Sequence, residues 1–139
     1  MNSTIKTLAI PGLAGGLLYL ILTFVADLLA QLIAPYSIFD VPGMREMNDP
    51  VMMLFFLYPF VFAFIAAWIW TIIRGSFPAD PVQGGVRYGA VLFLLIVIPN
   101  MWVIFTSMTY PTGFYLSNII SGLIAYPVIG YLNARYNQA

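Results

Sequence analysis

The chain has 139 residues, of which 62% are hydrophobic and 7% are charged, and its formal net charge is zero. Soluble domains average about 45–50% apolar and about 25% charged residues, so the composition predicts an integral membrane protein with room for about four helical spans of roughly 20 residues. It contains no cysteine, no histidine and no long basic run, which excludes disulfides, nearly all transition-metal sites and nucleic-acid binding, and we expect no cofactor and no metal.

The first predicted span covers residues 13–34, after a polar start that carries Lys6. Pro11 and Gly12 precede it and suit a bend or a helix start at the membrane surface. The apolar run is too long for the hydrophobic region of a signal peptide and contains Asp27, so we interpret it as a membrane span.

A polar stripe runs along this first span. Thr23, Asp27 and Gln31 are four residues apart, and Tyr19 and Gly16 continue the same side. Residues at this spacing lie on one face of a helix. Because a carboxylate is costly in hydrocarbon, the stripe must face protein or water.

The second and third spans each begin after an aspartate that is followed by proline. Asp49-Pro50 predicts an N-cap and a first helical residue for a span over residues 50–73. At Asp80-Pro81 the same pattern recurs, with Gln83 placed as in a capping box, and the apolar part of the third span covers residues 86–108.

The fourth predicted span covers residues 113–132. The turn before it is very short, which predicts that the third and fourth helices form a tight hairpin. Small residues make two ridges along this span, which favours close packing against the first or third span. The predicted fold is therefore all-α, a single-domain membrane four-helix bundle. The ridges are Ser117/Ser121/Ala125 and Asn118/Gly122/Tyr126/Gly130.

Basic residues predict the orientation. Four spans place the two termini and the connection between the second and third spans on one side of the membrane, and positive charge in short loops marks the cytoplasmic side. Arg45 is the only basic residue of the opposite side. We therefore expect a multi-pass protein of the cell (plasma or inner) membrane with both termini cytoplasmic. The basic residues of the terminal side are Lys6, Arg74, Arg87 and Arg135.

Counting residues inward from the outer end of each span predicts a polar layer. At about 1.5 Å per residue, all four spans contribute a polar or helix-breaking residue to one layer in the outer half of the membrane. Prolines 59, 99 and 127 each free a backbone carbonyl and predict space between helices. We expect an outward-facing cavity for a small polar molecule, a cation or a proton relay. Its candidate residues are Asp27, Gln31, Tyr58, Asn100 and Asn118, with Asn118, Tyr58 or Arg45 as the partner of Asp27.

A structural interpretation of the same residues stays open. Amide and hydroxyl side chains in membrane helices often join neighbouring helices by hydrogen bonds. Asp27 lies off the midplane, where water can reach it, so it is either a hydrated structural residue or part of a site.

Several stretches resemble uncharacterised small four-transmembrane-helix prokaryotic membrane proteins. They are GLAGG at 12–16, MREMND at 44–49, GGVRYGAVLFL at 84–94 and SGLIAYPVIGYLNARY at 121–136. The resemblance implies an architecture and no established activity.

Two known architectures offer further comparison. Small multidrug resistance transporters are similar in having four short spans and a carboxylate in the first, but their Glu-containing signature is absent and Asp27 lies nearer the outer surface. Glutathione-metabolising four-helix membrane enzymes are similar in size, but the basic residues that they need inside the bundle are missing.

Two classes of function remain. The first is transport or small-ligand binding by a homo-oligomer in contact with membrane lipid, since four short helices enclose little space. The second is a structural or accessory subunit of a larger membrane assembly. We do not expect an enzyme, because the chain has no histidine base, no cysteine nucleophile and no close pair of intramembrane carboxylates.

Overall fold

The computed structural model describes residues 3–137, and no strand occurs among them. Four helical segments within these residues are long and apolar enough to cross a membrane, which confirms the all-α class and agrees with the four predicted spans. These segments are Ser3–Ile33, Pro50–Ser76, Pro81–Ser107 and Thr112–Tyr136.

Two of the four segments are single α-helices, and the other two change helix type along their length. The first segment is α1 (Ser3–Ile33) and the last is α5 (Thr112–Tyr136). The second consists of the 3₁₀ helix η2 (Pro50–Leu57), α2 (Tyr58–Ile73) and η3 (Arg74–Ser76). The third consists of α3 (Pro81–Leu92), the π-helical turn η4 (Phe93–Val97) and α4 (Ile98–Ser107). A short 3₁₀ turn, η1 (Ile38–Asp40), lies in the long connection.

The first helix begins at Ser3 and therefore extends beyond the start of the predicted span at residue 13. Pro11 lies inside α1 and has no N–H for the carbonyl oxygen of Thr7. Asn137 supplies the missing donor, since its side-chain Nδ2 lies 2.7 Å from that oxygen. A residue at the far end of the chain therefore allows the helix to continue through the proline.

The fourth helix also exceeds its predicted bounds and continues to Tyr136. Asn133 directly follows the predicted end of the fourth span at residue 132, yet it is fully buried. Its Nδ2 donates to the carbonyl oxygen of Ile129 at 2.9 Å, so the amide is compatible with a helical interior.

Both predicted N-caps are confirmed. The Asp49 carboxylate accepts a hydrogen bond from the backbone N–H of Val51, and the Asp80 carboxylate accepts one from Gln83 at 2.8 Å. The third helix accordingly begins at Pro81, before the apolar stretch.

The prolines of the second and third spans coincide with changes of helix type. Pro59 cannot donate to the carbonyl oxygen of Phe55, and the N–H of Tyr58 bonds that oxygen instead as η2 ends. The π turn η4 lies directly before Pro99, and its cap bond runs from Ile98 back to Phe93.

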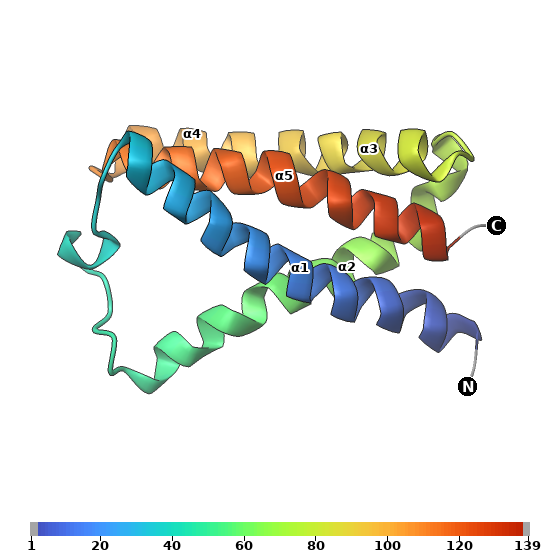
Figure 1. Ribbon diagram of the computed structural model, residues 1–139, viewed down its shortest axis with the longest axis horizontal. Coiled ribbons are helices and arrows are strands. Elements are labelled where there is room, and N and C mark those ends of the chain that lie inside the picture. The colour runs from blue at the N-terminus through green and yellow to red at the C-terminus, as the bar shows by residue number, and fades with distance from the viewer. Residues whose placement is uncertain (1–2, 138–139) are drawn as a thin grey trace.

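Figure 1 shows α5 beside both α1 and the α3–α4 segment, while α1 crosses α2. The termini lie at the same end of the molecule, here called the terminal end, and the connection over residues 34–49 lies at the opposite loop end. At the loop end, η2 diverges from α4 and α5, so the four helices do not close into a uniform bundle (Figure 1).

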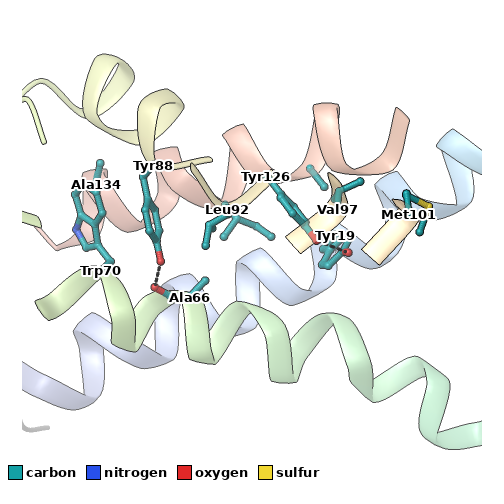
Figure 2. Packing of buried hydrophobic residues seen from close by; sticks show 11 residues of the cluster. Tyr19, Ala66, Trp70, Tyr88, Leu92, Val97, Met101, Tyr126 and Ala134 are labelled. Carbon is teal, nitrogen blue, oxygen red and sulfur yellow. Dashed lines mark hydrogen bonds between the residues drawn. The ribbon is translucent and has the colours of Figure 1, made fainter. Parts of the chain in front are cut away.

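The core is aromatic and lies where the helices converge. Figure 2 shows Trp70 and Tyr88 between α2, α3 and α5, and Tyr126 close to Tyr19. The phenol of Tyr88 is fully buried and donates to the carbonyl oxygen of Ala66 at 2.7 Å, which links α3 to α2. Buried tyrosines of this kind combine apolar packing with a satisfied hydroxyl.

Candidate functional site

The polar stripe of α1 faces α5. The Tyr19 and Tyr126 hydroxyls share a hydrogen bond of 3.4 Å, and one turn further along, the Thr23 and Ser121 hydroxyls lie 3.1 Å apart. Tyr19 and Thr23 therefore face protein, one of the two surroundings expected for the stripe, and the small-residue ridges of the fourth span provide the opposing surface.

Asp27, the next member of the stripe, accepts a hydrogen bond from Tyr36. The Tyr36 hydroxyl lies 2.5 Å from Asp27 Oδ1. Burial is the largest cause and the hydrogen bond to Asp27 the second; together they raise the pKa of Tyr36 to about 12. The phenol therefore stays protonated at neutral pH and acts as a donor to the carboxylate.

Gln31 holds Tyr36 in this position. Its Nε2 donates to the Tyr36 carbonyl oxygen at 2.8 Å, and its Oε1 accepts from the Tyr36 N–H at 3.0 Å. Pro35 ends the helical stretch just before, since its ring cannot continue the backbone bonding. The side-chain amide thus replaces helix bonds and turns the chain back over the end of α1. We refer to Asp27, Gln31 and Tyr36 as the α1 clamp.

A pocket of about 250 Å³ opens beside the α1 clamp. Asp27 is half-buried at its wall, and only Oδ1 of its carboxylate has a hydrogen-bond partner among residues 3–137. No salt bridge to Asp27 occurs in the described part of the chain. The pocket combines an anionic group with aromatic and hydroxyl groups. Its lining residues are Asp27, Gln31, Tyr36, Ser37, Ile38 and Phe39.

Arg45 is not the partner of Asp27, which corrects one of the predictions. Its guanidinium lies 2.8 Å from Asp49 in the exposed loop. This hydrogen bond and the one from the Val51 N–H hold the pKa of Asp49 below its usual range. The pairing is therefore present above the ordinary carboxylate pKa and is lost as pH falls through the lowered value.

Tyr58, Asn100 and Asn118 do not join the α1 clamp either. Asn118 donates to the carbonyl oxygen of Phe114 on its own helix at 2.9 Å. The ring of Tyr58 lies 6.0 Å from the ring of Tyr19. Tyr19 lies about two helical turns from Asp27 along α1, toward the terminal end. Asn100 is exposed on α4. Depth counting gives the level of a residue along its helix but not its direction, so the predicted layer does not converge on one cavity.

Sequence reasoning missed Tyr36, which it assigned no role in the site. The available signal was the short separation in sequence between Gln31 and Tyr36, with Pro35 between them. A proline directly after a helix permits a reversal of the chain, which could bring Tyr36 back to the helix end. No pattern in the sequence specifies the side-chain amide bonds that complete this reversal.

A larger pocket of about 510 Å³ lies along α4 and the start of α5 at the loop end. Its lining is mainly apolar, so it suits hydrocarbon better than a polar ligand. The lining residues are Ile98, Met101, Trp102, Phe105, Met108, Tyr110, Thr112, Tyr115 and Ile119.

These features define a small multi-pass α-helical membrane protein with an acidic pocket at its loop end. Within residues 3–137 no group of three or more acidic, histidine or cysteine side chains is placed to hold a metal ion. Comparisons with protein-family models, curated proteins and solved structures find no match to this chain.

Proposed function

We propose that this membrane protein binds a small organic cation in the pocket beside the α1 clamp. The observation that carries the proposal is the Asp27 carboxylate, which has one oxygen held by Tyr36, the other without a protein donor, and no basic side chain paired with it among residues 3–137. A charge-assisted bond from an ammonium group would satisfy the second oxygen. The rings of Tyr36 and Phe39 also line the pocket, and aromatic faces attract cations.

The distribution of basic residues supports an orientation for this site. With both termini cytoplasmic, Lys6, Arg74, Arg87 and Arg135 lie on the inner side, as the positive-inside rule requires. The third and fourth spans then form a hairpin that turns at the outer surface of the cell membrane. The pocket opens at that surface, where water-borne ligands arrive without crossing hydrocarbon.

Binding is better supported than transport. Toward the terminal end, the stripe of α1 becomes the glycine-rich stretch that contains Gly12 and Gly16. A Cβ atom at Gly16 would lie 2.8 Å from the backbone Cα of Phe60, and one at Gly12 would lie 2.5 Å from the ring of Phe64. The helices are in close contact there, so passage of a ligand requires α1 and α2 to separate.

The α1 clamp also supports an accessory role without a ligand. Asp27 and Gln31 together fix Tyr36, and through it the connection that follows α1. In that case the carboxylate is needed for folding, and the chain stabilises a larger membrane assembly.

Binding of tetramethylammonium and methylammonium to the protein in lipid nanodiscs, measured by calorimetry, tests the proposal. Asp27→Asn keeps the size and one acceptor oxygen but removes the charge. We expect it to weaken methylammonium binding by at least about tenfold, because a hydrogen bond to a charged group contributes about 1.5–3 kcal/mol. Tetramethylammonium has no N–H, so it tests the charge and the aromatic lining without a hydrogen bond. Asp40→Asn is the matched control, since Asp40 lies in the adjacent turn and does not line the pocket.

The two functions give different results. A wild-type protein that binds neither cation, or an Asp27→Asn variant that binds as tightly as the wild type, contradicts the cation site. Tyr36→Phe separates the roles further, because it keeps the charge and removes the bond to Asp27. The cation site predicts that Tyr36→Phe, which keeps the charge and the ring, weakens binding less than Asp27→Asn does, whereas a purely structural role predicts that Tyr36→Phe and Asp27→Asn lower stability alike.

A further inference from the structure

Three asparagines lie within the spans, and one of them differs from the other two. Asn118 and Asn133 each donate to the carbonyl oxygen four residues earlier on their own helix. The Asn100 side chain is exposed and makes no hydrogen bond within residues 3–137. It is therefore an amide on the surface of a membrane span with its donors and acceptor unused.

The position of Asn100 along the helix makes an unpaired amide costly in a bilayer. Asn100 lies seven residues before the end of the span Pro81–Ser107, which places it roughly 10 Å inside the end of the helix. Its neighbours one turn away are Ile96 and Val103, and Val103 is 58% exposed. Hydrocarbon offers no hydrogen-bond partner to an amide at this depth.

The helix itself explains why Asn100 does not bond backward as the other two asparagines do. The carbonyl that it would use belongs to Ile96, which lies in the π turn η4. A π turn follows an i→i+5 register, and the i→i+4 pattern is interrupted there. Pro99 next to Asn100 has no N–H, so it leaves one carbonyl of the preceding turn without its backbone donor.

We propose that the α4 face around Asn100 binds a second copy of this chain, with the two Asn100 amides hydrogen-bonded to each other. A carboxamide is both donor and acceptor, so it is complementary to itself across a two-fold axis. Acyl chains offer neither group. No charged side chain lies on α4 to oppose a second copy. The inference does not rest on cation binding at Asp27.

The absence of cysteine from the chain allows a direct test. A single Val103→Cys substitution places a thiol one turn from Asn100 on the same side of α4. In liposomes under mild oxidation we expect a disulfide-linked dimer. Adding Asn100→Leu should reduce the crosslinked fraction by about tenfold, because it removes the hydrogen bonds between the two Asn100 amides. Adding Asn100→Gln, which restores an amide, should recover most of it.

Two matched controls separate pairing from folding. Asn118→Leu in the Val103→Cys background removes an amide that bonds its own helix, and it should leave the crosslink unchanged. Ile98→Cys, exposed toward the apolar pocket on another side of α4, should not crosslink. The proposal is overturned if Asn100→Leu crosslinks as well as the parent, if the Val103→Cys protein stays monomeric, or if a different protein is found bound at this face.

Discussion

The glycines between α3 and α5 provide the sharpest test of how the helices pack. A Cβ atom on Gly89 would lie 2.6 Å from the backbone Cα and N of Pro127 and from the carbonyl oxygen of Tyr126. These are backbone atoms of α5 and not the ends of flexible side chains. The Gly89→Ala substitution can therefore be accommodated only if the two helices move apart.

Overpacking of this kind costs about 1–3 kcal/mol. We expect Gly89→Ala to lower the free energy of unfolding by that amount, measured by equilibrium unfolding in mixed micelles and followed by circular dichroism. The separation should also weaken the adjacent bond from Tyr88 to Ala66.

Gly75→Ala is the control for this experiment. Within residues 3–137, and apart from its neighbours along the chain, no atom lies within 4 Å of a Cβ built at Gly75, so this variant should stay within about 0.5 kcal/mol of the wild type. If Gly89→Ala is as stable as Gly75→Ala, α3 and α5 do not approach as closely as described, and the packing argument is refuted.

Two further substitutions test other parts of the structure. Tyr88→Phe removes the donor to the Ala66 carbonyl and should lower unfolding free energy by about 1 kcal/mol in the same assay, while an unchanged midpoint would show that the buried bond contributes nothing net. Gly43 has φ +88°, so Gly43→Ala should strain the long connection by about 1 kcal/mol and speed its cleavage by protease; equal cleavage rates would contradict that backbone conformation.

Hydropathy and helix signals predicted most of the architecture. The spans are apolar runs bounded by charge or proline, and the caps at Asp49 and Asp80 depend only on neighbouring residues. The polar stripe was also predictable, because a four-residue spacing fixes which side chains share a helix face. Each of these signals is local and follows from backbone geometry.

The features that the sequence did not predict depend on distant or directional contacts. Pro11 remains inside a helix because Asn137 supplies a donor from 126 positions further along the chain. Depth counting placed Asn100 level with Asp27 but could not give the rotation of α4 about its axis. The π turn before Pro99 alters that rotation, and no local pattern specifies its length.

The chemistry of the α1 stripe changes along its length, and this change argues for a site at the loop end. Near the terminal end, Gly12 lies against the ring of Phe64 and Gly16 against the backbone and ring of Phe60, which leaves little room for a ligand. Beyond Tyr19 the stripe presents hydroxyls and then a carboxylate, and η2 has diverged from α4 and α5. The closely packed terminal end of the molecule thus supports a more open loop end. Asp27 lies at this more open end and is bonded to Tyr36, so the clamp that stabilises the loop also holds a carboxylate with one unbonded oxygen at the wall of the pocket.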